Sequence, residues 1–318
     1  MAGTARKSRK SPAVAPKQDV YQEITDRIVE LLEQGTAPWH QPWDTLGVAL
    51  SMSTSKHYRG INALLLQMTG LVKGYGSPWW GTYKQISERG GQVRKGEKGT
   101  QVVLWKPLAV EDKDNPGEQK QIWMLRTYTV FNAEQVDGDL GLPEIGARPQ
   151  NDAIAECEAA LAVYYATGPK LHFGGDVAGY IPSRDEVRMP ERNQFHSSER
   201  YYGAWFHESV HSTGHATRLD RAGIVEGHSF GDELYSKEEL VAELGAAFLA
   251  GHTGIATQTL PSSASYLQSW IKVLQGDKKL VVQAAAQAQK AVDMILGGTA
   301  KVETSPDEEG AKPALVAA

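Results

Sequence analysis

The sequence has few of the features that mark disulfide-rich, secreted or membrane proteins. Its single cysteine, Cys157, excludes an intramolecular disulfide and a cysteine-rich metal site. No apolar run approaches the roughly 18 residues that a transmembrane helix requires. Residues 1–17 are small, polar and basic, without the apolar stretch of a signal peptide. We therefore expect a cytoplasmic protein that has no membrane partner.

The chain also lacks a strong excess of either charge. Its formal net charge of −5 over 318 residues argues, taken alone, against a nucleic-acid-binding protein. The charge is unevenly distributed, however, because residues 1–150 sum to +3 and residues 151–318 to −8. The length is sufficient for two hydrophobic cores. The asymmetry therefore predicts two domains that have different partners.

Apolar periodicity predicts an α+β fold, with a small α+β domain followed by a mainly helical one. In the first half we expect helices over 18–34, 62–72 and 82–89, and strands over 101–107 and 122–132. In the second half we expect helices over 152–166, 198–213, 236–250, 263–274 and 279–296. Around Trp39 and Trp43, two Pro-Trp pairs indicate an extended turn.

Composition places the domain boundaries in segments rich in glycine, proline or charge. The expected organisation is a disordered basic tail at 1–17, a first domain at 18–138, a linker at 139–150, a second domain at 151–298 and a disordered tail at 299–318.

Residues 207–211, with the sequence HESVH, are the stretch in which residue type and spacing together dictate a chemistry. Histidines four apart on a helix project from the same face, so His207 and His211 can reach one metal ion. The intervening Glu208 can take a proton from a metal-bound water. This HExxH pattern is typical of zinc metallopeptidases and predicts one Zn²⁺ per chain.

Two histidines leave such a site one protein ligand short. The metzincin pattern would place a third histidine at position 217, where the chain has Thr217, although its glycine is present as Gly214. A downstream helix offers Glu239 and Glu243 on one face, an arrangement that resembles gluzincins. We expect Glu239 to bind the metal and Glu243 to orient a histidine, and the reverse assignment stays open.

The first half combines aromatic and basic residues. Six of the eight tryptophans lie before residue 124, and residues 84–106 contain six basic side chains against two acidic ones. Cations that follow phosphates and rings that stack on bases suit single-stranded DNA. The alternative is that the tryptophans form a core, which we expect for Trp105 and Trp123. Trp79 and Trp80 lie in a segment rich in glycine and proline, so we expect at least one exposed ring.

Several segments, in order, resemble ArdC-type antirestriction proteins. In the first half these are 57–62 (HYRGIN), 79–85 (WWGTYKQ), 90–99 (GGQVRKGEKG) and 130–135 (VFNAEQ). In the second half they are 185–190 (DEVRMP), 207–215 (HESVHSTGH) and 238–243 (EELVAE). The resemblance implies a domain that binds single-stranded DNA, fused to a zincin-like metallopeptidase domain. It also implies an origin on plasmids or other mobile elements, and protection of incoming DNA from restriction.

The resemblance further implies that basic and aromatic residues of the first-half segments contact DNA. These residues are Tyr58, Arg59, Trp79, Trp80, Tyr83, Lys84, Arg94, Lys95 and Lys98. Two alternatives differ in class. One is a DNA-binding module with a structural or vestigial metal site, and the intact Glu208 argues against it. The other is a peptidase whose first domain recognises a host protein substrate, and the basic and tryptophan-rich pattern argues against that.

Overall fold

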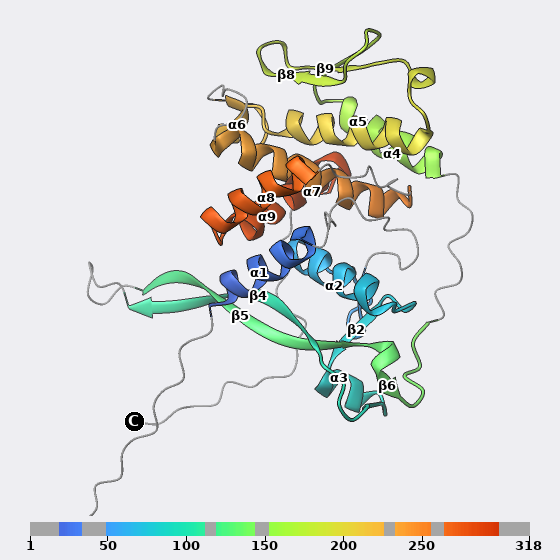
Figure 1. The fold of residues 1–318 in the computed structure, drawn as a ribbon, viewed down its shortest axis with the longest axis vertical. Coiled ribbons are helices and arrows are strands. Elements are labelled where there is room, and N and C mark those ends of the chain that lie inside the picture. The colour runs from blue at the N-terminus through green and yellow to red at the C-terminus, as the bar shows by residue number, and fades with distance from the viewer. Residues whose placement is uncertain are drawn as a thin grey trace, which may run out of the picture.

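The computed structural model describes residues 19–33, 49–111, 119–143, 153–225, 233–255 and 264–298. The two expected tails and the turn around Trp39 and Trp43 lie outside these residues. The chain forms two domains, with the N-terminal elements in the lower part of Figure 1 and the C-terminal elements in the upper part. None of the helices in the described ranges is long and apolar enough to cross a membrane.

The N-terminal domain is built on a four-stranded sheet in the order β1-β2-β5-β4. β1 and β2 are parallel, and β5 is antiparallel to both β2 and β4. The strands are β1 (Leu50–Ser51), β2 (Trp79–Thr82), β4 (Thr100–Glu111) and β5 (Gln119–Asn132), and a separate antiparallel pair is β3 (Gln92–Val93) with β6 (Val136–Asp137). The helices are α1 (Val20–Glu33), α2 (Gly60–Lys73) and α3 (Tyr83–Glu88), with a 3₁₀ turn at η2 (Ala133–Gln135).

Local sequence fixes the start of α3. The Thr82 side chain accepts a hydrogen bond from the Gln85 backbone, and the Gln85 side chain accepts one from the Thr82 backbone. This reciprocal pair satisfies amide groups that a helix start leaves without partners. The helix therefore begins directly after β2, and the two adjacent tryptophans belong to the strand rather than to a loop.

The C-terminal domain is mainly helical, as expected. Its helices are α4 (Ala153–Tyr165), α5 (Ser198–Thr213), α6 (Ala222–Val225), α7 (Glu233–Thr253), α8 (Ala264–Gly276) and α9 (Leu280–Ile295). The domain also contains a small three-stranded sheet in the order β7-β9-β8. Its strands are β7 (Lys170–Phe173), β8 (Gly179–Ile181) and β9 (Glu186–Met189), with 3₁₀ turns at η3 (Pro182–Arg184) and η4 (Arg192–Gln194). These strands have three or four residues each, too few for a periodic pattern, and the sequence did not predict them.

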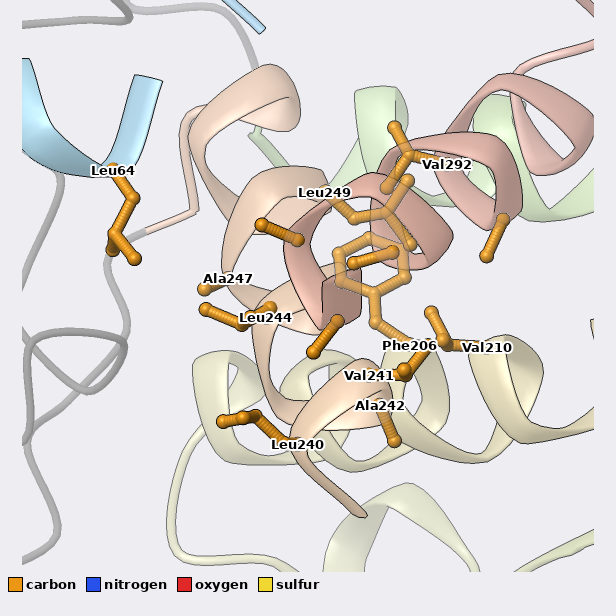
Figure 2. Close-up of a cluster of buried hydrophobic side chains, with 14 of the residues drawn as sticks. Leu64, Phe206, Val210, Leu240, Val241, Ala242, Leu244, Ala247, Leu249 and Val292 are labelled. Carbon is orange, nitrogen blue, oxygen red and sulfur yellow. The ribbon is translucent and has the colours of Figure 1, made fainter. Parts of the chain in front are cut away.

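The largest hydrophobic cluster contains side chains of both domains, and two smaller clusters lie within the N-terminal domain. The largest cluster of buried side chains includes Ile28 of α1 and Leu64 of α2 together with Phe206, Leu244 and Val292 of the C-terminal domain. Figure 2 shows part of this cluster, with Leu64 next to the helices of the C-terminal domain. No sheet in the described ranges contains strands from both halves. The chain thus has two domains by topology, and they are joined by helix packing.

The expected linker at 139–150 begins later than predicted. Leu140 is buried against Ile86 and Val93, and Leu142 packs on the same cluster. The indole Nε1 of Trp79 also donates a hydrogen bond to the Pro143 carbonyl, at 3.3 Å. The N-terminal domain therefore continues through residue 143. Residues 144–150 of the expected linker lie outside the described ranges.

Candidate metal centre

Helices α5 and α7 bring the candidate metal-binding side chains together. α5 begins at Ser197, whose side chain accepts a hydrogen bond from the Arg200 backbone. Gly245 lets α7 approach closely, because a Cβ there would lie only 2.7 Å from Val210 Cγ2. This contact fixes the position of α7 along α5. It places Glu239 of α7 opposite the two histidines of α5.

Three side chains converge on one point, from His207, His211 and Glu239. The two histidine Nε2 atoms are 3.0 Å apart, and each lies 3.5 Å from a carboxylate oxygen of Glu239. Ligand atoms held at about 2.1 Å from a tetrahedral ion are about 3.4 Å from one another. The three distances therefore suit a single ion, and two imidazoles with one carboxylate form a donor set that Zn²⁺ accepts.

The charge around this cluster also favours a cation. Burial opposes a charged imidazole at His211, but its hydrogen bonds with Glu238 and Glu239 outweigh burial and raise its pKa to about 10. Burial likewise opposes a charged Glu239, but contacts with His207 and His211 hold the pKa of this carboxyl well below its ordinary value. The residues thus stabilise positive charge at the point where a metal ion would bind.

Glu238, which the sequence analysis did not assign to the site, contacts a metal-facing histidine, and the role expected of Glu243 stays a prediction. Glu238 Oε1 lies 3.2 Å from His211 Nδ1, so its contact determines which way the ring faces. Glu243 is absent from the group of candidate ligands found in the described residues. Adjacent positions on a helix differ by about 100°, so Glu238 can contact the back of His211 while Glu239 faces the metal position.

Arg221 holds Glu238 in place. Its Nε and Nη2 donate to the two Glu238 oxygens at 2.9 and 2.6 Å. Its remaining donors reach Thr213 Oγ1 and the Val210 carbonyl, both at 2.7 Å. Arg221 is 8% exposed and Glu238 5%, so the ion pair is fully desolvated and fully hydrogen-bonded. Gly214 makes this possible, since a Cβ there would lie 3.0 Å from the guanidinium.

Glu208, the expected general base, is positioned by β8. Its Oε2 accepts a hydrogen bond from the Tyr180 backbone amide at 2.9 Å. The Tyr180 hydroxyl donates to Asp185, and Arg218 donates to both Asp185 and the Ser212 carbonyl at the end of α5. β8 is therefore anchored beside α5. In the sequence, Asp185 was only part of a segment that resembles the family. The structure shows that Asp185 anchors β8 through its contacts with Tyr180 and Arg218.

The structure excludes the metzincin arrangement within the described residues. His215 Nδ1 lies 2.9 Å from the Thr217 hydroxyl, and neither residue belongs to the candidate metal-binding group. His228 lies outside the described ranges. The third side chain at the site is Glu239, as expected.

The expectation of an exposed ring at Trp79 or Trp80 is wrong. Trp79 is 6% exposed and Trp80 2%, and both lie on β2, which pairs with β1 and β5. Trp80 packs edge-on against Tyr75, with ring centroids 5.9 Å apart. Both rings belong to the core of the N-terminal domain, so neither can stack on a base. The side chains of Trp105 and Trp123 lie outside the described part of the chain.

The other expected DNA contacts separate into two groups. Arg59 forms an ion pair with Asp293 of α9, so it joins the two domains, and Tyr58 is half-buried beside the Trp80 cluster. The second group lies on or beside α3 and β3, and its side chains are exposed. This group comprises Tyr83, Lys84, Arg94, Lys95 and Lys98. Within it, Arg94 also contacts Glu97 and Asp137, and Lys84 lies 3.7 Å from Glu88. We call these five residues the α3–β3 surface.

Comparison with known families finds a match in each domain. Residues 18–131 match the family described as the N-terminal domain of anti-restriction factor ArdC. Residues 158–287 match a family described as zincin-like metallopeptidase.

Among solved structures, the chain is similar to the antirestriction ArdC protein from plasmid R388. The metal-free form has 40% identity and a TM-score of 0.70, covering 87% of this chain and 97% of that one. The Mn(II)-bound form has 38% identity and a TM-score of 0.70, covering 90% and 100%.

The chain is also similar to proteins of known sequence. It is 34% identical to the uncharacterized protein y4eC of Sinorhizobium fredii (strain NBRC 101917 / NGR234), covering 86% of this chain and 91% of that protein. Two DNA primases TraC of Escherichia coli are 39% and 36% identical over 91% and 94% of this chain. The chain spans only 20% and 29% of the length of these TraC proteins.

Proposed function

Because the chain belongs to the ArdC antirestriction family, we propose that it binds single-stranded DNA and protects the incoming DNA of a mobile element from restriction, with a zinc-dependent peptidase domain, in the host cytoplasm. The observation that supports it most is the convergence of His207, His211 and Glu239 beside a positioned Glu208. A family resemblance alone would not require an intact catalytic geometry.

We assign one Zn²⁺ per chain to His207, His211 and Glu239, with Glu238 orienting His211. Two histidines and one glutamate are a common catalytic zinc set, which leaves a fourth position for water or substrate. The R388 protein has a Mn(II)-bound structure, so metal analysis of this protein must compare the two ions. When bound, the metal would polarise a scissile carbonyl and activate water.

The chain's own residues supply the proton transfers of peptide hydrolysis. Glu208 accepts a proton from the attacking water and passes it to the leaving amine. The Tyr180 amide fixes one oxygen of Glu208, so the carboxylate has a defined direction before substrate arrives. No serine or cysteine nucleophile is required, and burial raises the pKa of the Cys157 thiol to about 11, which makes it a poor nucleophile at neutral pH.

The N-terminal domain provides the single-strand-binding part of the proposal. The α3–β3 surface presents an exposed tyrosine and four basic side chains, and exposed cations bind the phosphates of a nucleic-acid strand. The similarity to segments of DNA primases TraC supports a role in DNA transactions. It gives no support to primase activity in this chain, which spans a small part of those proteins.

The alternative of a structural or vestigial metal site predicts that Glu208 has no role. Glu208 is nevertheless present next to His207, and the Tyr180 amide donates a hydrogen bond to its carboxylate, which favours catalysis. The alternative of protein recognition by the N-terminal domain predicts no DNA affinity. A single pair of variants separates these functions.

We expect Glu208→Gln to keep metal content and DNA affinity while losing hydrolysis, because only the proton acceptor is removed. Proteomes of host cells that express wild type or Glu208→Gln should differ by fragments of a host protein. Glu199→Gln, at the start of the same helix and outside the cluster, is the matched control. Equal fragment patterns in wild type and Glu208→Gln would overturn the peptidase assignment. Absence of single-strand affinity in wild type would overturn the DNA-binding assignment.

A further inference from the structure

A cavity of about 460 Å³ lies at the junction of the two domains. One side consists of the segment 55–59 and α2, and the other of α7 and α9. Its volume falls within the range of small-molecule sites, about 300–1,000 Å³. It is separate from the candidate metal centre, although α7 contributes to both. The residues used below are Lys56, His57, Tyr58, Gln67, Phe248 and Val292.

Gln67 is the feature that indicates a ligand. It lies on α2, is 6% exposed and lines the cavity. Its side-chain amide has no hydrogen-bond partner within the part of the chain that the structure describes. Arg200 Nε is the fully buried side-chain atom without a partner in the described ranges, so the Gln67 amide atoms retain access to the cavity. An amide offers both donors and an acceptor, so a ligand that displaces solvent there would present both kinds of group.

The neighbouring residues narrow the chemistry of that partner. Phe248 and Val292 provide apolar surface on the C-terminal side, and Tyr58 provides a half-buried aromatic ring on the other. Lys56 is exposed at the rim beside His57, so positive charge lies at the mouth rather than inside. The second cation of this segment, Arg59, is already paired with Asp293. The cavity therefore suits a ligand that has a flat apolar body, a polar edge that faces Gln67, and a negatively charged group outside the mouth.

We propose that the cavity holds one nucleotide of a bound single strand, with the base inside and its phosphate at Lys56 and His57. The proposal rests on the single-strand binding inferred above and extends it to a specific position. A base has two apolar faces and an edge that presents donors and acceptors, which matches the walls and the Gln67 amide. Its phosphate matches the cationic rim.

This placement also gives the domain junction a function. The α3–β3 surface holds a strand only from the N-terminal domain, whereas a nucleotide in the cavity contacts α2, α7 and α9 together. The strand then binds the assembled protein rather than one domain. The Arg59–Asp293 pair and the hydrogen bond from the Gly60 amide to Gln289, at 2.9 Å, keep the two walls together.

The test compares full-length Gln67→Met with wild type. Methionine has a similar volume but no amide, so we expect the affinity for an oligo-dT strand to fall about five- to tenfold, the effect of one or two lost hydrogen bonds. Without DNA the variant should be as stable as wild type or more so, because the amide is unpaired there. Gln283→Met, at an exposed position of α9 outside the cavity, is the control. Unchanged affinity in Gln67→Met would overturn the proposal.

A second measurement locates the strand directly. An oligonucleotide that contains 4-thiothymidine, irradiated in complex with wild type, should crosslink to Tyr58 or Phe248, and Lys56→Gln should reduce the salt slope of binding by about one ion. Crosslinks confined to the α3–β3 surface would overturn this proposal and leave the proposed function intact. No affinity for any strand would overturn both.

Thymidine 5′-monophosphate separates a strand from a free nucleotide as the occupant. We expect it to compete with the crosslink only at concentrations at least 100-fold above the oligonucleotide, and to lose this competition in Gln67→Met. Competition at equal concentration would assign the cavity to a free nucleotide and overturn the strand as its ligand.

Discussion

The candidate metal centre takes most of its residues from one helix, whereas the predicted DNA contacts Trp79 and Trp80 lie on a strand that other segments cover. His207, Glu208 and His211 lie on one helix, where a spacing of four residues fixes the direction of the side chains regardless of the rest of the fold. Trp79 and Trp80 lie on a strand whose exposure depends on two neighbouring strands and on segments far away in the chain. A site defined within one helix is thus predictable from sequence, whereas a surface defined by what covers it is not.

The largest expected effect is the loss of metal from the centre on α5 and α7. His211→Ala should abolish stoichiometric zinc, because it removes one of the three proposed protein ligands and the ring that Glu238 contacts. Metal content is measured by mass spectrometry after dialysis against a weak chelator. His215→Ala, four residues later on the chain, should retain one ion. Full metal content in His211→Ala would show that the site lies elsewhere.

The second-largest expected effect is at Trp80, in the pair of tryptophans for which the sequence predicted an exposed ring. Trp80→Ala should destabilise the protein by about 3–5 kcal/mol, because it empties a core position that is 2% exposed. Tyr83→Ala, three residues later at the start of α3 and 51% exposed, should change the free energy of unfolding by less than about 0.5 kcal/mol. Urea denaturation measures both. A stable Trp80→Ala protein with reduced DNA affinity would restore the stacking interpretation.

Within the metal centre, the sequence could not predict how the second helix, α7, packs against α5. Helical spacing offered Glu239 and Glu243 as one face of α7, and Glu239 does lie at the histidines. Spacing could not show how α7 crosses α5, which depends on the contact between Gly245 and Val210. That crossing brings Glu238 to His211. The same arrangement buries Arg221.

In the rest of the fold, too, the sequence predicted the elements that have a long local pattern. The helices with long periodic patterns were placed within a few residues, and the expected helix at 198–213 coincides with α5. The strands β7, β8 and β9 were missed, because each has only three or four residues, too few for a periodic pattern. The start of α3 was predictable, since Thr82 and Gln85 form a local capping pair.

A smaller effect tests the role of Glu238. Glu238→Gln and Arg221→Lys should each weaken zinc binding about 10- to 100-fold, as is usual when the group behind a metal-binding histidine is lost. Competition with a chromogenic chelator measures this affinity, and circular dichroism checks that the fold is kept. Glu243→Gln is the matched control and should bind zinc as wild type does. The reverse result would return the orienting role to Glu243.

The smallest effect concerns the exposed cations of the N-terminal domain. Replacing Lys84, Lys95 and Lys98 together by glutamine should lower the dependence of log affinity on log salt by about two ions, because each phosphate contact on a single strand contributes about 0.7. Fluorescence anisotropy at several salt concentrations measures the slope. A variant with Lys170, Lys272 and Lys290 replaced, all exposed in the C-terminal domain, loses the same charge. Equal slopes in the two variants would indicate a general charge effect and not a binding surface.

The packing of α1 against α8 has a consequence for how the protein is made. The Thr25 hydroxyl donates to the Lys278 carbonyl across 253 residues of sequence, and the buried face of α1 lies in the core shared with the C-terminal domain. During synthesis, α1 therefore leaves the ribosome long before its packing partner exists. Contacts so distant in sequence slow folding and leave apolar surface exposed in the meantime. An N-terminal fragment that ends at residue 143 should consequently aggregate, and the nascent chain should engage chaperones until its last helices emerge.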